Sequence, residues 1–249
     1  MRKITLDSLD ALFEKLAQYA KLYLPVDTNA GAKFEEWERG KQLSNALNTV
    51  RSAKDFFFPQ TENLMDFQVE GKKISVIDTR KECEDFIIFG ARACDVRSFT
   101  VLDRVFLAEP TDTYYQNRRE HGIIVSMACT RPQETCFCQT FAIDPAEPEG
   151  DVACYRTDDA LYLLAKTEKG EAMLAAVSDL TEESDGAAVE AQKNTIRERM
   201  EKLPLASLRT DAFGKDKTKE FFDAPEWKAL SETCLGCGTC TFVCPTCQC

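Results

Sequence analysis

The chain has 249 residues, of which 44% are apolar, and a formal net charge of -11. A chain of this length and apolar content can fold into a globular protein with a hydrophobic core. The N-terminal residues MRKITLDSLDALFEKLAQYAK are charged throughout, unlike a signal peptide, and no apolar run approaches the roughly 18 residues that span a bilayer. The sequence therefore argues against a membrane-spanning protein, and its acidic charge without a basic tract disfavours nucleic-acid binding.

The first half of the chain alternates between helical and strand patterns. Residues 7–23 have apolar positions at helical spacing, and Pro25 is expected to end that helix. The segment 67–78 is typical of a hairpin with a turn at Gly71 and Lys72. The apolar run FIIFGA at 86–91 predicts a buried strand, which leads into a helix from about 95 to 106.

The second half continues this alternation. A polar helix is predicted around 112–120 and a strand at 122–129, and ALYLLAK predicts another strand with TEKGEAMLAAV as a helix after it. A long helix from about 182 to 202 has few apolar positions, so we expect a solvated face or a linker. The fold class predicted is α/β, with a mixed or parallel sheet and flanking helices over residues 1–215, and residues 216–249 are expected to form the start of a ferredoxin-like cluster module.

The last sixteen residues, CLGCGTCTFVCPTCQC, hold six of the twelve cysteines. Three of these cysteines follow one another at three-residue steps, and a fourth precedes Pro245. This spacing matches the C-x2-C-x2-C-x3-C-P run of bacterial ferredoxins, in which thiolates bind the irons of a 4Fe-4S cluster. The predicted ligands are Cys234, Cys237, Cys240 and Cys244.

The fourth ligand of this cluster stays open. In two-cluster ferredoxins the cysteine before the proline binds the other cluster, so Cys244 is not expected to complete the cluster that begins at Cys234. Either Cys247 or Cys249 folds back to serve, or the chain is a fragment whose continuation carries a reciprocal motif, and we favour the fragment. Zinc is the competing metal, but zinc ribbons separate their C-x2-C pairs by roughly a dozen or more residues.

A second set of cysteines lies near the ends of two predicted strands. Cys94 follows the strand at 86–91, Cys129 ends the next one, and Cys136 and Cys138 lie in the loop after it. If these strands are parallel neighbours, their carboxyl ends meet at one edge of the sheet, where α/β proteins place their sites. Four thiolates is the number that a 4Fe-4S cluster needs, so we predict a second cluster site formed by these four cysteines.

Two other interpretations of these cysteines remain. In the first, all four are ordinary buried cysteines, which behave as small hydrophobic residues. In the second, Cys94 is a reactive thiolate at a helix N-terminus, and Arg92 and Arg97 lower its pKa. His121, the only histidine, is far from Cys94 in sequence, so no Cys-His pair is indicated. Cys154 is expected in an acidic loop, apart from the other cysteines.

Five segments in order resemble one known family: KDFFFPQTE, FGARACDVRSFTVLDRVF, ACTRPQETCFC, TEKGEAML and the terminal CLGCGTCTFVCPTCQC. The chain resembles iron-sulfur subunits that include the β subunit of sulfhydrogenases, the A subunit of anaerobic sulfite reductase, and the iron-sulfur subunit of flavin oxidoreductases linked to heterodisulfide reductase. Members of this family continue into a second cluster motif, which this sequence lacks.

The resemblance implies a cytoplasmic electron-relay subunit of anaerobic metabolism, with 4Fe-4S clusters as cofactors. Its implied partners are a flavoprotein that oxidises NAD(P)H and a downstream reductase or hydrogenase. The chain has no G-x-G-x-x-G or P-loop motif of its own, so flavin or nicotinamide chemistry would belong to another subunit. The alternatives are a zinc-stabilised binding or scaffold module and a thiol redox protein that uses Cys94.

Overall fold

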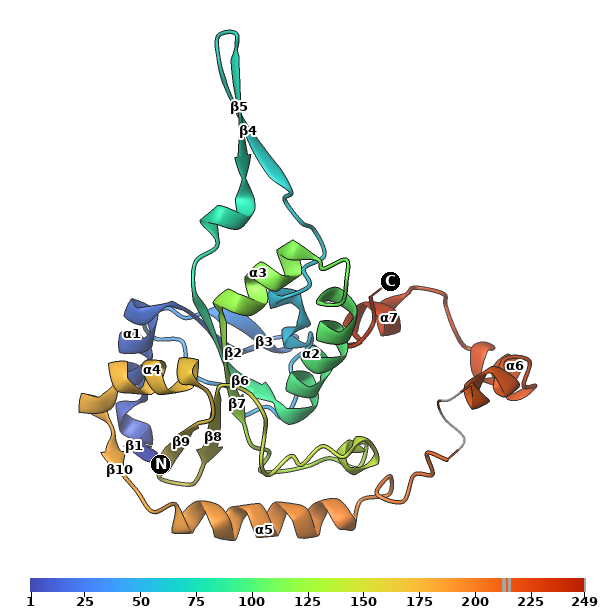
Figure 1. Cartoon of the computed structure of the whole chain (residues 1–249). Coiled ribbons are helices and arrows are strands. Elements are labelled where there is room, and N and C mark those ends of the chain that lie inside the picture. The colour runs from blue at the N-terminus through green and yellow to red at the C-terminus, as the bar shows by residue number, and fades with distance from the viewer. Residues whose placement is uncertain (212–213, 215, 249) are drawn as a thin grey trace.

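An eight-stranded mixed sheet forms the centre of the protein in a computed structural model, which describes residues 1–211, 214 and 216–248 (Figure 1). The strands lie in the order β10-β1-β9-β8-β7-β6-β2-β3. Their bounds are β1 (Arg2–Thr5), β2 (Lys21–Thr28), β3 (Gly31–Glu36), β6 (Phe86–Arg92), β7 (Gly122–Met127), β8 (Val152–Arg156), β9 (Ala160–Ala165) and β10 (Glu182–Glu183).

The middle of this sheet is parallel. β2 pairs with β6, β6 with β7 and β7 with β8 in parallel, whereas β3, β9, β1 and β10 are added antiparallel at the two sides. The predicted mixed α/β sheet is confirmed, and so is the parallel pairing of the two strands that precede cysteines. Because β6, β7 and β8 run in one direction, their carboxyl ends share one edge of the sheet.

Helices cover both faces of the sheet. Their bounds are α1 (Leu9–Tyr19), α2 (Ala93–Phe106), α3 (Thr113–His121), α4 (Glu168–Ala176), α5 (Ala187–Glu201), α6 (Glu226–Ser231) and α7 (Thr239–Val243), with 3-10 turns at Leu6–Ser8, Ala53–Phe56, Thr79–Glu82, Cys138–Phe141, Ser178–Leu180 and Lys217–Phe221. In the described part of the chain, no helix is long and apolar enough to cross a membrane.

Alternate residues of the same strands face two separate cores. On one face Ile87 and Val125 pack with Phe13 of α1 and Met173 of α4. On the other face the strands pack against α2, α3 and the 3-10 turn at Ala53–Phe56, and this second core includes Ile88, Phe99, Tyr115, Phe57 and Ile124. Strands buried on both faces explain the nearly continuous apolar runs of β6 and β7.

Several parts of the sheet differ from the prediction. The helix predicted at 7–23 ends at Tyr19, and Pro25 does not end it but lies inside β2, opposite Phe34 of the side strand β3. Neither β2 nor the strand β1 was predicted. Nor was β8, and Cys154 consequently lies fully buried in the sheet and not in a loop. β8 is only five residues long and follows the acidic Pro-rich loop, which conceals its pattern.

The long polar helix predicted at about 182–202 has the expected solvated face, but it is not a linker, because it packs on the body of the protein. Its central part is α5, which buries Val189, Lys193, Ile196 and Met200 along one stripe. The Lys193 ammonium lies 5.0 Å from the centre of the Tyr155 ring, so this lysine packs like an apolar residue while its charge reaches Glu190. Figure 1 shows α5 running along the underside of the molecule, below the loop that follows β7.

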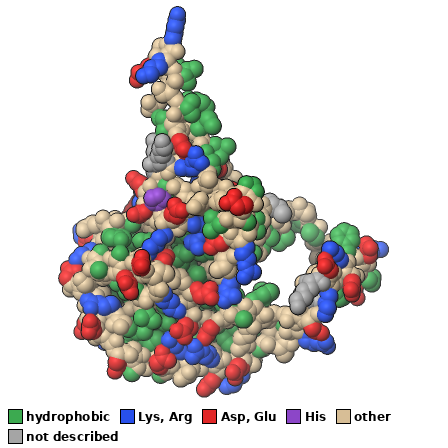
Figure 2. Space-filling model, viewed as in Figure 1, with side chains coloured by type: hydrophobic (Ala, Val, Ile, Leu, Met, Phe, Trp, Pro, Cys, Tyr) green, Lys and Arg blue, Asp and Glu red, His purple; other side chains and the backbone are tan. Residues whose placement is uncertain are grey.

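A separate two-stranded hairpin projects from the body of the protein (Figure 1). Its strands are β4 (Met65–Glu70) and β5 (Lys73–Asp78), which confirms the predicted hairpin and its turn at Gly71 and Lys72. Phe67, Val69, Ile74 and Val76 are each more than 60% exposed, and Figure 2 shows hydrophobic side chains along this arm. The arm is held to the body near its base, where Tyr114 donates a hydrogen bond to the Leu64 carbonyl.

Candidate metal centres

The structure brings the four cysteines of the second predicted set, Cys94, Cys129, Cys136 and Cys138, together at the carboxyl edge of β6 and β7. Cys94 lies in the first turn of α2, directly after β6, and Cys129 follows β7. Cys136 and Cys138 lie in the next loop, where Cys138 begins a 3-10 turn. A bulge at Gly90, whose φ is +92°, shifts the register of β6 just before it reaches this edge.

The thiols of this set interact with one another. Cys94 hydrogen-bonds to Cys138, which raises the pKa of Cys94 far above its ordinary value and lowers the pKa of Cys138. Burial raises the pKa of Cys129 to about 12, with further contributions from Cys94 and Cys136. The pKa of Cys138 also responds to the charges of Cys129 and Cys136. Each of the four thiols therefore lies within electrostatic reach of others in the set.

Backbone N-H groups point at three of these sulfurs. Cys94 accepts a hydrogen bond from the N-H of Asp95, and Cys138 from its own N-H. The Sγ of Cys136 accepts one from the N-H of Gln133 at 3.3 Å. Such donors stabilise thiolates and the sulfurs of a cluster, so this donor pattern suits a cluster site.

Helix α5 covers the loop that carries Cys136 and Cys138. Both cysteines pack against Ile196 and Met200, which are each 2% exposed, and against Ala146. Arg199 on the same helix donates to the Thr130 carbonyl at 3.1 Å, and Arg197 pairs with Asp144 at 2.7 Å. These contacts fix the loop on both sides of the Cys136-Phe-Cys138 segment.

The surroundings of Cys94 do not favour a reactive thiolate. Although Cys94 is exposed, the hydrogen bond with Cys138 raises its pKa, whereas an activated cysteine needs a lowered pKa. Arg97 pairs with Glu149 at 2.8 Å. The Nδ1 of His121 lies 2.6 Å from the Oδ1 of Asp85, at the amino ends of β6 and β7, whereas Cys94 lies at their carboxyl ends.

In the described ranges, no three His, Cys, Asp or Glu side chains are arranged to hold a single metal ion. A 4Fe-4S cluster needs one thiolate for each of its four irons. The donor set of Cys94, Cys129, Cys136 and Cys138 supplies four thiols, and so fits such a cluster by its chemistry and its number.

The C-terminal cysteines lie on an exposed segment around α7. Gly236 and Gly238 have φ values of +65° and +72°, which confirms the unusual backbone that the motif predicts. The Gly236 N-H donates to Cys234 Sγ at 3.4 Å, and Cys237 Sγ lies 3.1 Å from the Thr239 hydroxyl. Cys234, Cys237 and Cys240 are all exposed, and among residues 216–248 no hydrogen bond joins their thiols.

The end of this segment is partly buried. Although burial opposes it, hydrogen bonds from Thr246 and Cys247 lower the pKa of Cys244 to about 7. Cys247 thus lies beside Cys244. Cys249, the other cysteine considered as a fold-back ligand, lies outside the described residues.

Lys54 attaches this C-terminal segment to the body of the protein. Its side chain is 7% exposed, and its ammonium donates to the carbonyls of Cys244 at 2.9 Å, Cys247 at 3.2 Å and Phe242 at 3.5 Å. The guanidinium of Arg51 lies 4.7 Å from the centre of the Phe242 ring. The sequence did not reveal these two residues, because their partners lie almost 190 residues away and are mostly backbone carbonyls.

Comparison with curated proteins places the chain in a family. It is 30% identical over 260 residues to the Sulfhydrogenase 2 subunit beta of Pyrococcus furiosus, an alignment that covers 100% of this chain and 73% of that protein. The chain therefore belongs to the sulfhydrogenase β-subunit family, as the resemblance of its segments indicates. No protein-family model matches the chain, and no solved structure does.

Proposed function

We propose that this protein is an electron-relay subunit of an oxidoreductase complex and carries 4Fe-4S clusters. The observation that carries the proposal is the convergence of Cys94, Cys129, Cys136 and Cys138, which lie in different segments but interact at one edge of the sheet. Family membership supports it, because the relative is named as one subunit of a hydrogenase. A bound cluster would take up and pass on single electrons, with a potential set by its surroundings.

Each cysteine set would have its own part in the relay. The four cysteines at the sheet edge would bind one cluster in an α/β domain of residues 1–215. Cys234, Cys237 and Cys240 would bind three irons of another in a module that begins at residue 216, and Cys244 would serve a partner cluster. This division follows the ferredoxin pattern, in which the cysteine before the proline crosses to the second cluster.

The rest of the chain holds and shields these cysteines. The N-H groups of Gln133 and Gly236 donate to cysteine sulfurs and would stabilise reduced clusters, which are more negative. The cluster that contains Ile196 and Met200 covers one side of Cys136 and Cys138, which are half-buried. Burial of this kind lowers the local dielectric constant and so tunes a cluster's potential.

We further propose that the protein works in the reducing cytoplasm, between a flavoprotein that oxidises NAD(P)H and a downstream reductase or hydrogenase. The projecting hairpin supports a role within a complex, since exposed apolar patches of this kind mark interaction surfaces. Replacing Val69 and Val76 with serine should abolish co-purification with co-expressed partner subunits, and the melting temperature of the isolated chain should hold. Unchanged co-purification would remove the hairpin from the interface.

The proposal is tested by the metal content of the full chain isolated without oxygen. We expect iron and acid-labile sulfide in equal amounts, and visible absorption that bleaches on reduction with dithionite. Colourless protein that holds zinc alone would contradict the relay and favour a zinc-stabilised scaffold. Metal-free protein with one rapidly alkylated thiol at Cys94 would favour thiol redox chemistry.

A further inference from the structure

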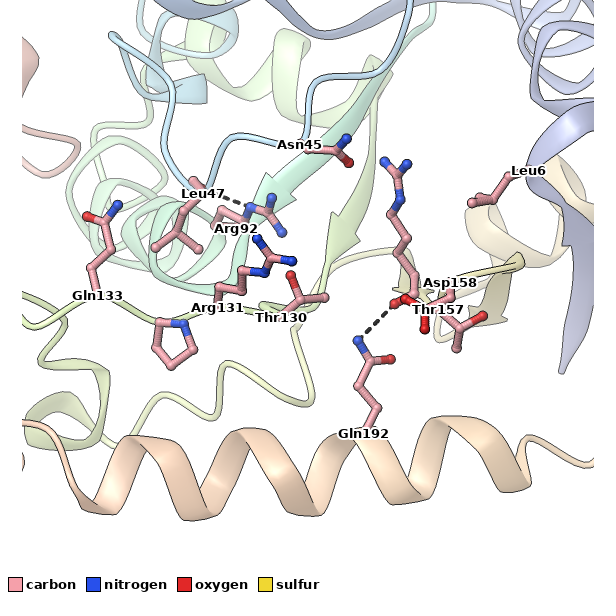
Figure 3. Close-up of a pocket in the computed structure, with 12 residues that line it drawn as sticks. Leu6, Asn45, Leu47, Arg92, Thr130, Arg131, Gln133, Thr157, Asp158 and Gln192 are labelled. Carbon is pink, nitrogen blue, oxygen red and sulfur yellow. Dashed lines mark hydrogen bonds between the residues drawn. The ribbon is translucent and has the colours of Figure 1, made fainter.

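A cavity of about 840 Å³ opens beside the sheet-edge cysteines, at the carboxyl ends of β6, β7 and β8. Arg92 ends β6 and Arg156 ends β8, while Thr130 to Gln133 follow β7, and all of them line the cavity. Helix α5 closes the opposite side with Gln192 (Figure 3). This edge is where open α/β sheets bind their ligands, and the volume lies within the range of small-molecule sites.

The lining of the cavity is positively charged, although the whole chain is strongly acidic. It contains three arginines, Arg92, Arg131 and Arg156, and a single carboxylate, Asp158. Figure 3 shows Arg92 and Arg131 side by side, extending into the space between the sheet edge and α5. An anion that enters this space meets a net positive charge in a cleft, where the field is focused.

Arg92 has a structural part in this lining. It is 9% exposed, and its guanidinium donates to the carbonyls of Leu47 at 3.0 Å, Ala128 at 3.1 Å and Ala46 at 2.8 Å. These contacts hold two loops of the cavity wall in place. They also fix the positive charge at the inner end of the cavity, since an arginine stays protonated at all physiological pH values.

Arg131 and Arg156 are different, because their guanidinium groups remain available. Within the described ranges, neither side chain forms a hydrogen bond or an ion pair with another residue. A planar guanidinium without a partner is suited to bind phosphate or carboxylate oxygens in pairs. Both groups belong to residues of the lining, so a ligand inside the cavity would reach them.

Gln192 fixes the α5 side of the cavity. Its Nε2 donates to the Arg156 carbonyl at 2.8 Å, as the dashed line in Figure 3 marks. This bond joins α5 to the end of β8, the strand that carries Arg156.

We propose that this cavity binds a small organic anion whose phosphate or carboxylate groups lie on Arg131 and Arg156. The site goes beyond electron relay, because it requires no cluster to bind its ligand. It is nevertheless linked to the cysteines: Thr130 follows Cys129 directly, and Gln133 both lines the cavity and donates its N-H to Cys136. Ligand binding therefore acts on the loop that holds Cys136.

Calorimetric titration of the full chain, isolated without oxygen, tests the proposal. The probes are ADP, citrate and inorganic phosphate, which separate a phosphorylated ligand from a polycarboxylate and from the bare anion. We expect ADP or citrate to bind more tightly than phosphate, and the affinity to fall as salt is raised, because charged groups carry the contact. Absence of binding by all three probes at millimolar concentration would overturn the proposal.

Variants locate the binding. Arg131→Gln and Arg156→Gln should each weaken binding by at least about tenfold, since each removes charge-assisted hydrogen bonds. The matched control Arg104→Gln removes an exposed arginine of α2 that does not line the cavity, and it should leave the affinity unchanged. Asp158→Asn should tighten binding about threefold, because it removes the negative charge of the lining. Equal affinity in all four variants would show that the probe binds elsewhere and would overturn the assignment.

Discussion

The two cysteine sets of this protein present the same ligand chemistry on different supports. At the sheet edge, Cys94, Cys129, Cys136 and Cys138 come from separate segments and already interact through their thiols. The C-terminal cysteines are close in sequence, but Cys234, Cys237 and Cys240 are exposed. The first set is therefore brought together by tertiary structure, whereas the second is defined by its spacing in the sequence.

The largest expected effect is the loss of one cluster when a sheet-edge cysteine is changed. Cys138→Ser removes a thiolate that also fixes Cys94 by a hydrogen bond, so iron bound at this set should be lost entirely. Iron analysis and visible spectra of anaerobic protein measure the loss. Cys83→Ser is the matched control, because Cys83 lies outside both sets, and it should keep the full iron content. Equal iron in both variants would contradict the sheet-edge site.

The next largest effect concerns the free energy of unfolding, because α5 packs against the loop of the sheet-edge site. Met200→Ala opens a cavity beside Cys136 and Cys138, where Met200 is 2% exposed, and should lower the free energy of unfolding by about 2 to 4 kcal/mol. Urea denaturation measures it. Glu198→Ala changes an exposed position on the same helix and should alter the free energy by less than about 0.5 kcal/mol. A similar value for both variants would show that α5 does not hold this site.

A smaller and local effect is expected at the C-terminal set. Lys54→Met removes the hydrogen bonds to the carbonyls of Phe242, Cys244 and Cys247. Hydrogen bonds from a charged group contribute about 1.5 to 3 kcal/mol, so the amide hydrogens of residues 239–248 should exchange at least about tenfold faster. Hydrogen exchange with mass spectrometry measures this.

The control for Lys54 uses an exposed lysine. Lys228→Met, on α6, should leave the exchange of residues 239–248 unchanged, and neither variant should alter exchange in β6 or β7. Lys54→Arg should restore part of the protection, because it keeps a donor with a positive charge. Unchanged exchange in Lys54→Met would mean that the C-terminal segment is not anchored through Lys54.

The smallest difference concerns the order in which thiols react in reduced, metal-free protein. Cys234, Cys237 and Cys240 are exposed, whereas Cys129 is 8% exposed, so the first three should be alkylated well before Cys129. Mass spectrometry after short exposure to iodoacetamide gives the order. Alkylation of Cys129 at the same rate as Cys234 would show that the sheet-edge site is open in the absence of metal.

Much of the fold follows from local patterns, but α5 shows where such patterns fail. Continuous apolar runs predicted β6 and β7, and a polar turn predicted the hairpin. The buried stripe of α5 includes Lys193, whose ammonium lies over the Tyr155 ring, and this charged residue makes a partly buried helix look polar in the sequence. β8 was missed because it is only five residues long and follows an acidic loop.

The candidate sites also contain residues that neighbouring positions in the sequence predict and residues that depend on distant parts of the chain. The C-terminal ligands are predicted by spacing alone, and the sheet-edge cysteines by the rule that neighbouring parallel strands end at one edge. The contacts of Lys54 and the arginines of the cavity could not be predicted. The contacts of Lys54 depend on carbonyls 188 to 193 residues away in the sequence. The arginines of the cavity come together only because β8 lies beside β7, and β8 was not predicted.

The central claim is that the sheet edge holds a cluster independently of the C-terminal motif. The most direct test is iron and sulfide analysis, with electron paramagnetic resonance, of anaerobic protein in which Cys234, Cys237, Cys240 and Cys244 are all serine. We expect iron and acid-labile sulfide in equal amounts and a spectrum that changes on reduction by dithionite. A colourless, iron-free variant would contradict it, because all cluster binding would then reside in the C-terminal segment.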